Sequence, residues 1–441
     1  MQKYITIIGL EIHIEPNTKS KMFCSCSQNH FGAKPNTQTC PICLGLPGAL
    51  PIANKEAINK TIKLGLALGS KIFEKSYFYR KHYFYPDLPK SFQTSQKDNP
   101  FCVGGELLGK QINHIHLEED AGKLIHSDNT SLVDFNRSGC ALIEIVTEPV
   151  FHSVEEVISF TKELQLIAKY LDISSADMEK GTMRLEANIS LANSKSQTLN
   201  SKLPNYKVEL KNINSFKFLE KALNAEIERQ TKALDSNEKL VQETRGYDEK
   251  TKATFSQRTK ADSDDYRYFP EADLPPIHIG ELSISNFQFS ILELPAKKRL
   301  RFEKEFKLSK DYIEILVSDL ERANYFEECV KQSSNLAMKP SVKLIADLMI
   351  NKNLDKEFPE PAGLVAKLYA LSHREYAENN TTENAVKQVL SENPEVVISY
   401  KNGKGQIIGF LIGQVQKLLK GKGDPKLINS KLVEKLREEN F

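Results

Sequence analysis

Residues 5–14, with the sequence ITIIGLEIHI, decide the fold of this chain. From residue 8 onward, apolar residues alternate with Gly9, Glu11 and His13, and a period of two predicts a β-strand with one buried face. Because successive side chains of a strand point to opposite faces, Glu11 and His13 share one face. The stretch therefore predicts a sheet that buries one side and displays carboxylate and imidazole groups on the other.

Four further segments show the same alternation and extend the predicted sheet. They cover residues 110–120, 141–146, 183–191 and 206–213. Their polar positions include Glu119, Glu144, Glu186 and Glu209. Acidic side chains carried by several strands can converge on one concave surface.

Strand patterns end near residue 290, and helical patterns dominate after it. Before that point, one helix begins after Asn54, a second is capped by Ser153 with Glu156 in a capping box, and a third carries an apolar stripe. The 441 residues therefore predict an α+β fold. Its parts are a mixed β-sheet domain with flanking helices over residues 1–290 and a helical region after it.

Composition places few limits on the partners of the chain. The formal net charge is +2, so no field of the whole molecule indicates a nucleic-acid partner. The first residues lack the regions of a signal peptide, and no apolar run is long enough to span a bilayer. The chain is therefore expected to be a cytoplasmic protein without a membrane partner.

Four of the seven cysteines fall within residues 23–44. Cys24 and Cys26 form a C-x-C pair, and Cys40 and Cys43 form a C-x-x-C pair. This spacing predicts a structural zinc site, because four thiolates leave no position open for water. Free thiols or a redox pair are the alternatives, although no thioredoxin-like pattern surrounds the second pair.

The acidic strand positions predict a second kind of metal site. Several carboxylates gathered with one imidazole repel one another unless a divalent cation neutralises them, and Mg²⁺ suits such oxygen ligands when phosphates complete its shell. This arrangement is typical of phosphoryl transfer. Each carboxylate taken alone also fits an ordinary exposed position on a sheet, so both interpretations stay open at this point.

One glycine-rich stretch is not interpreted as a nucleotide site. Residues 104–110, GGELLGK, match the beginning of a Walker A loop. However, Gln111 replaces the Ser or Thr that holds magnesium, and a strand pattern follows instead of a helix. The stretch is therefore predicted to be a hairpin.

The C-terminal residues carry a local charge asymmetry that the total conceals. From Lys401 to the end, nine Lys or Arg stand against four Asp or Glu. This pattern is typical of a solvated helical face, and a surface that contacts phosphates is the alternative.

Longer motifs resemble one known family, in the order that the family shows them. They are IGLEIHIEPNTKSKMFCSCS (8–27), CPICLGLPGALPIANKEA (40–57), RKHYFYPDLPKSFQTSQ (80–96), HLEEDAGK (116–123), LVDFNRSGCALIEIVTEP (132–149), GTMRLEANISL (181–191), VELKNINSF (208–216), QETRGYDE (242–249) and SDDYRYFPEADLPP (263–276). The family is the B subunit of the bacterial tRNA-dependent aspartyl/glutamyl amidotransferase. Residues 402–429 resemble its C-terminal tail, so the resemblance covers essentially the whole chain.

The resemblance implies an ATP-dependent amide-forming enzyme. Members use ATP and Mg²⁺ to phosphorylate the side-chain carboxylate of mischarged Glu-tRNA(Gln) or Asp-tRNA(Asn). Ammonia released by a glutaminase A subunit then displaces the phosphate, and a small C subunit completes the heterotrimer. The resemblance also implies that the cradle-like first domain, over residues 1–290, is catalytic and that the four cysteines hold structural Zn²⁺. It further implies an all-α helical domain over residues 291–372 and a helical tail domain over residues 373–441 that touches tRNA.

The resemblance assigns roles to individual positions of this sequence. The catalytic positions are Glu11, His13, Glu119, Glu186 and Glu209, of which Glu11, His13, Glu119 and Glu209 are expected to bind magnesium. The substrate and ATP pocket is expected to include Lys81, Tyr83, Asp87 and Glu144. The tRNA contacts are expected at Lys404, Lys420 and Lys422. Glu186 departs from the family, in which Asp is common at that place, and this puts the geometry of the metal ligands in doubt.

Two other functions compete with this one. The first is a zinc-stabilised, non-catalytic tRNA-binding scaffold of the same complex, which would have no reason to keep the acidic positions in their motifs. The second is a stand-alone amide ligase, which is disfavoured because no glutaminase motif is recognisable. The sequence does not distinguish a Gln-tRNA product from an Asn-tRNA product.

Overall fold

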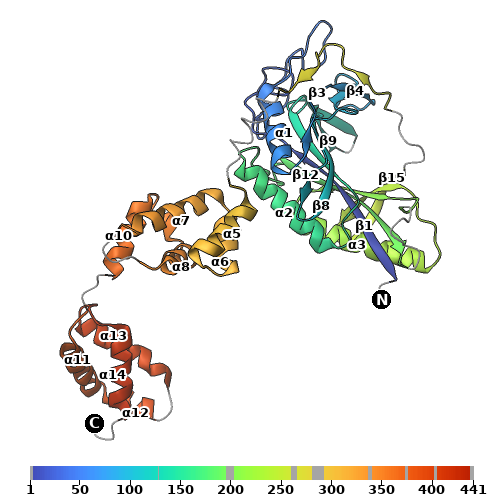
Figure 1. The fold of residues 1–441 in the computed structure, drawn as a ribbon. Helices are drawn as coiled ribbons and strands as arrows, with labels where there is room; N and C mark the ends of the chain where they lie inside the picture. The colour runs from blue at the N-terminus through green and yellow to red at the C-terminus, as the bar shows by residue number, and fades with distance from the viewer. Residues whose placement is uncertain are drawn as a thin grey trace. The chain divides into compact units, whose positions relative to one another are not determined.

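The computed structural model describes residues 3–127, 129–194, 203–259, 266–280, 293–335, 340–372, 376–401 and 405–437. The chain divides into two compact units, shown in Figure 1. The first unit comprises Met1–Glu305 and Val317–Leu320 and contains the strands. The second comprises Phe306–Leu316 and Glu321–Phe441 and is helical in its described parts. The predicted α+β class is confirmed.

A ten-stranded sheet forms the centre of the first unit. Its strands are β1 (Tyr4–Ile14), β2 (Lys71–Ile72), β6 (Cys102–Val103), β7 (Glu106–Leu107), β8 (Lys110–Glu119), β11 (Ala141–Thr147), β12 (Met183–Asn193), β13 (Val208–Ile213), β14 (Glu243–Asp248) and β15 (Ala253–Thr259). They follow the order β15-β14-β13-β12-β1-β11-β8-β6-β2, with β7 paired to β8, and only β13 and β14 run parallel. The five predicted strands are β1, β8, β11, β12 and β13, and they lie next to one another in the sheet.

The apolar face of the sheet packs against three helices. They are α1 (Lys55–Ala67), α2 (Val154–Tyr170) and α3 (Phe216–Asp235). Ile8, Leu10, Ile12 and Ile14 of β1 are at most 1% exposed in the core that these elements share. The helices begin where side chains cap them, because Asn54, Ser153 and Ser215 accept hydrogen bonds from the first free N–H groups. This packing leaves the opposite face, with its polar side chains, for a functional site.

Smaller elements extend from the central sheet. They are β3 (Lys75–Ser76), β4 (Tyr79–His82), β5 (Phe92–Ser95), β9 (Lys123–Ser127), β10 (Thr130–Asp134), β16 (Phe269–Pro270) and β17 (Ile277–His278). β4 lies between β16 and β5, β9 pairs with β10, and β3 pairs with β17. The stretch at residues 104–110 is a hairpin, as predicted, because Glu106 pairs with Gln111 and Leu107 with Lys110.

The described chain after residue 293 is helical. Its elements are α5 (Pro295–Phe306), α6 (Lys310–Val317), α7 (Leu320–Ser333), α8 (Val342–Lys352), α9 (Leu354–Glu357), α10 (Pro361–Ser372), α11 (Asn379–Glu392), α12 (Pro394–Lys401), η1 (Gly405–Ile407), α13 (Ile408–Leu418) and α14 (Pro425–Arg437). The elements from α11 to α14 share a small core of their own. The boundaries expected near residues 290 and 373 fall on segments 281–292 and 373–375, which lie outside the described residues.

None of the described helices is both long enough and apolar enough to cross a membrane.

Candidate active site and metal centre

Strand register gathers the acidic residues on the face of the sheet that the three helices do not cover. β1 pairs Glu11 with Glu186 of β12, and it pairs His13 with Glu144 of β11. Directly paired residues point to the same face, so these side chains meet. They form two groups, each with ligand atoms within 4.8 Å of one another: the histidine cluster of His13, Glu118 and Glu144, and the glutamate cluster of Glu11, Glu186 and Glu209.

The histidine cluster is a set of buried charges that balance one another. Nε2 of His13 lies 3.2 Å from Oε2 of Glu144 and 3.7 Å from Oε1 of Glu118. Nε2 of His116 lies 3.4 Å from Oε2 of Glu144. Burial alone would lower the pKa of His13, but the carboxylates of Glu144 and Glu118 outweigh it and raise the pKa to about 9. The imidazolium of His13 therefore neutralises the carboxylates at the place where a divalent cation would do so.

Without divalent cations, the free energy of unfolding should depend on pH through His13. Its pKa is about 9 in the folded chain and about 6.5 in an unfolded one. The stabilisation is thus fully present below the unfolded pKa and is lost as the pH rises through the folded pKa, by about 3 kcal/mol in total. In denaturant titrations with a chelator present, the free energy of unfolding of the His13→Gln variant should show little of this decline with pH.

The matched control for this measurement is His126→Gln. His126 is exposed on the hairpin of β9 and β10, away from the cluster, so its removal should leave the pH dependence unchanged. The same decline in His13→Gln and in the unaltered chain would show that the carboxylates do not hold a proton on His13.

The glutamate cluster brings three carboxylate groups together beside Lys211. Nζ of Lys211 lies 2.8 Å from Oε2 of Glu186 and 3.6 Å from Oε1 of Glu209. Asn188 donates a hydrogen bond of 3.0 Å to Oε1 of Glu11. Burial raises the pKa of Glu11, and the neighbouring carboxylates raise it further. Three convergent carboxylate groups fit the oxygen coordination of Mg²⁺.

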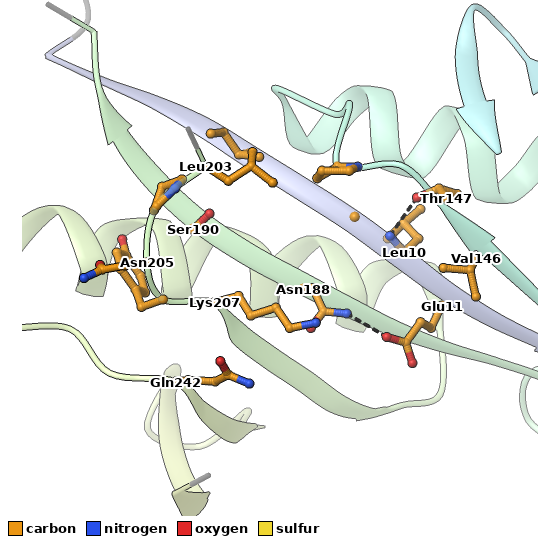
Figure 2. Close-up of a pocket in the computed structure, with 15 residues that line it drawn as sticks. Leu10, Glu11, Val146, Thr147, Asn188, Ser190, Leu203, Asn205, Lys207 and Gln242 are labelled. Carbon is orange, nitrogen blue, oxygen red and sulfur yellow. Dashed lines mark hydrogen bonds between the residues drawn. The ribbon is translucent and has the colours of Figure 1, made fainter. Parts of the chain in front are cut away.

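A cavity of about 380 Å³ opens beside Glu11. Figure 2 shows β1 and β12 forming its floor, with Asn188 directed at Glu11. Ile7, Val146 and Leu203 contribute apolar lining. The cavity therefore suits the uncharged portion of a molecule, and an anionic end of that molecule would need a cation bound between it and the carboxylates.

Glu119, which was expected to bind magnesium, belongs to neither carboxylate cluster of the described residues. The side chains of Glu118 and Glu119 point to opposite faces of β8, so Glu118 shares the face of His13. Glu119 forms an ion pair with Lys90 and accepts a hydrogen bond of 2.8 Å from the backbone N–H of Thr94. The alternation along residues 110–119 contained the signal that assigns Glu118.

Lys81 and Tyr83, two of the expected pocket residues, lie close to the histidine cluster. Burial alone would lower the pKa of Lys81, but the carboxylates of Glu118 and Glu144 raise it. Nζ of Lys81 lies 5.8 Å from the centre of the Tyr83 ring. Glu144 is itself a cluster member. Asp87 belongs to neither cluster of the described residues.

The four cysteines meet in the loop between β1 and α1. Their Sγ atoms lie within 4.8 Å of one another, and those of Cys40 and Cys43 are 3.8 Å apart. Zinc–sulfur bonds of about 2.3 Å in a tetrahedron place the sulfurs about 3.8 Å apart, so the residues fit Zn²⁺. A hydrogen bond from the Cys24 thiol and the nearby ammonium group of Lys21 contribute to lowering the pKa of Cys43 to about 5. A thiolate is the form that binds a metal.

Two of the three expected tRNA contacts lie in the described residues. Lys420 and Lys422 are exposed in the loop between α13 and α14. Lys404 falls within residues 402–404, which lie outside the described residues.

Fold and site define an α+β protein with two carboxylate-containing clusters on one face of a sheet and a cluster of four cysteines, each of which could hold a metal ion. Residues 6–285 match the family model described as the GatB/GatE catalytic domain, and residues 360–436 match the GatB domain. The chain belongs to the family of B subunits of the tRNA-dependent aspartyl/glutamyl amidotransferases.

Curated relatives support this membership over the whole length. The chain is 40% identical to the B subunit of the aspartyl/glutamyl-tRNA(Asn/Gln) amidotransferase of Thermodesulfovibrio yellowstonii, with 99% of this chain and 100% of that protein covered. It is 39% identical to the protein of the same name from Brachyspira hyodysenteriae, with 99% and 100% covered. It is 41% identical to that of Thermosipho melanesiensis, with 97% and 98% covered.

Proposed function

We propose that the chain activates the side-chain carboxylate of Glu-tRNA(Gln), Asp-tRNA(Asn) or both for amide formation. It transfers the γ-phosphoryl group of ATP to that carboxylate, and ammonia then displaces phosphate to give Gln-tRNA(Gln) or Asn-tRNA(Asn). Ammonia comes from a glutaminase A subunit, a small C subunit completes the heterotrimer, and the complex works in the cytoplasm. The observation that supports the proposal is the gathering of the two clusters on one face of the sheet, with a cavity beside Glu11.

The chemistry explains why such a site is needed. A carboxylate is a poor electrophile, whereas an acyl phosphate offers ammonia a good leaving group. A bound Mg²⁺ supplies positive charge that offsets the charge of the transferring phosphoryl group. Of the expected magnesium ligands, Glu11, His13 and Glu209 belong to the two clusters, and the role of Glu119 stays a prediction. We propose Glu118 and Glu186 as further ligands, because they complete the clusters.

The other residues of the site contribute charge and space. Lys81 and Lys211 hold ammonium groups beside the two clusters, where phosphate oxygens require positive partners. We assign the cavity beside Glu11 to the uncharged part of ATP, because apolar and uncharged polar side chains make up most of its lining and it borders Glu11 of the glutamate cluster. Asn188, which bonds to Glu11, holds that carboxylate toward the cavity.

The alternative of a non-catalytic scaffold gives no reason for the glutamate cluster. Glu11 lies among carboxylates that raise its pKa. Burying like charges costs stability unless a cation compensates for them. A scaffold gains nothing from that cost, whereas a site for Mg²⁺ and ATP requires it.

The experiment that tests the proposal isolates this chain from the glutaminase. The chain with its A and C partners is supplied with Glu-tRNA(Gln) or Asp-tRNA(Asn), ATP, Mg²⁺ and ammonium in place of glutamine. Amide formation that requires both ATP and Mg²⁺ is expected, and the tRNA that is converted defines the substrate. Bound tRNA without any amide product would favour the scaffold.

We propose that the exposed lysines of the tail contact the phosphate backbone of tRNA. Replacing Lys420 and Lys422 together by Gln should weaken tRNA binding about tenfold near physiological salt and should lower the slope of log K against log salt by about 1.5. The loss should be similar for both tRNAs, because phosphate contacts carry no sequence information. Filter binding or fluorescence anisotropy over a series of salt concentrations measures the affinity for each tRNA and its salt dependence.

Lys387→Gln is the matched control for the tail lysines. Lys387 is exposed on α11 and forms an ion pair with Glu383 at 3.1 Å. Its replacement should leave the salt slope unchanged. If the double variant and the unaltered chain have equal salt slopes, Lys420 and Lys422 do not contact the phosphates of tRNA.

A further inference from the structure

Lys21 is buried completely beside the four cysteines. Its side chain is 0% exposed, and lysine is almost never buried to this extent without a partner. Nζ donates hydrogen bonds of 2.8 Å to the carbonyl oxygens of Gln38 and Ser138, and it lies 3.8 Å from Sγ of Cys43. The three donors of the ammonium group thus have two carbonyls and one sulfur as acceptors.

The balancing negative charge for Lys21 comes from the cysteine sulfurs. No described Asp or Glu lies within ion-pair distance of Nζ of Lys21. A buried ammonium group without an opposite charge is strongly destabilising. Zn²⁺ bound by four thiolates carries a net charge of −2, which also requires a counter-charge when water is excluded. The ammonium group of Lys21 and the zinc–thiolate centre therefore supply each other with the opposite charge that each requires.

Lys21 also contacts both halves of the loop that holds the cysteines. Its backbone N–H donates a hydrogen bond of 2.9 Å to the carbonyl oxygen of Cys26. Its side chain reaches Cys43 in the second half and Ser138 in the turn before β11. That turn approaches closely, because a Cβ added at Gly139 would lie 3.0 Å from Cβ of Cys43.

We propose that Lys21 is the buried counter-charge of the metal centre formed by Cys24, Cys26, Cys40 and Cys43. This assignment rests on the zinc occupancy proposed for these cysteines and not on the amide-forming reaction. Lys21 is a positioning residue: it binds no metal, but it lowers the electrostatic cost of gathering four thiolates and holds Cys43 against the turn at Ser138. Partners outside the ligand shell of a metal typically change its affinity by 10–100-fold.

The test compares zinc affinities of the full chain by competition with a chromophoric chelator at one pH. Lys21→Met should bind zinc at least about tenfold more weakly than the unaltered chain, whereas Lys19→Met, at an exposed position two residues away, should bind within about twofold. Lys21→Gln keeps hydrogen-bond donors without the charge and should lose as much affinity as Lys21→Met. Unchanged affinity in the Lys21 variants would overturn the proposal.

A second set of variants, made in a chain that carries Cys26→His, distinguishes the effect of the Lys21 charge from the effect of its packing. Cys26→His replaces one thiolate by a neutral imidazole and reduces the charge of the zinc centre from about −2 to about −1. In that background, Lys21→Met should cost clearly less affinity than in the unaltered chain. Equal losses in both backgrounds would assign Lys21 to packing alone and overturn the proposal. An unaltered chain that takes up no zinc would also overturn it, while leaving the ammonium-dependent amide assay free to succeed.

Discussion

Glu118→Gln is expected to lower ammonium-dependent amide formation by about 10²–10³-fold. The replacement removes one carboxylate from the histidine cluster, where Oε1 of Glu118 lies 3.7 Å from Nε2 of His13. Transition-state charge stabilisation of about 3–4 kcal/mol is a usual contribution for one such group, and each 1.36 kcal/mol is a factor of ten in rate. Initial rates at saturating tRNA measure the loss of activity. Binding of Mn²⁺, used as a spectroscopic substitute for Mg²⁺, is measured in parallel.

Glu119→Gln is the matched comparison, because it makes the same change one residue further along the strand. It weakens the ion pair with Lys90, which is on the other face. The variant should therefore lose about 1–3 kcal/mol of stability in denaturant titrations and keep Mn²⁺ affinity within about threefold. Weaker Mn²⁺ binding in Glu119→Gln than in Glu118→Gln would contradict the geometry described for β8.

Removal of the metal from the cysteine centre is expected to have the largest effect on stability. The loop between β1 and α1 contains no helix, and its only strand-like pairing in the described residues is the bridge between Ser20 and Ser27. Met22 and Phe23 join the main core, but Gln28 is the only buried residue between positions 27 and 39, so metal bonds replace hydrophobic packing there. Saturating zinc should stabilise the chain by about 4 kcal/mol or more. Cys40→Ser should remove that gain.

Limited proteolysis and denaturant titrations with and without a chelator measure the effect of the metal. The chelated chain and Cys40→Ser should both be cut within residues 27–39, while Ser25→Ala should behave like the unaltered chain because Ser25 is exposed between two ligands. A chelated chain that resists protease as well as the loaded one would show that the four cysteines need no metal to hold the loop.

Local patterns predicted the elements of the fold well. The alternation in residues 5–14 corresponds to β1, and the caps at Asn54 and Ser153 mark the beginnings of α1 and α2. The cysteine spacing predicted a cluster that the structure assembles. These features depend on residues close together in the sequence, so the physical reasons for them are visible in one stretch of chain.

The arrangement of the acidic residues was not predictable in the same way. The division into two clusters depends on the register between β1 and β12, which are distant in sequence and pair Glu11 with Glu186. No local pattern determines such a register. Lys211 and Lys90 were not singled out either, because an isolated lysine in a strand or loop has no signal that its carboxylate partner is near.

The side-chain oxygens of the tRNA-bound substrate provide the most direct test of carboxylate activation. Glu-tRNA(Gln) or Asp-tRNA(Asn) labelled with ¹⁸O in its side-chain carboxylate is converted by the complex with ATP, Mg²⁺ and ammonium, and the inorganic phosphate is analysed by mass spectrometry. Activation by phosphoryl transfer predicts one ¹⁸O atom in the phosphate for each amide formed, and little labelled phosphate from the Glu118→Gln variant, which forms little product. Amide formation with unlabelled phosphate would contradict the account.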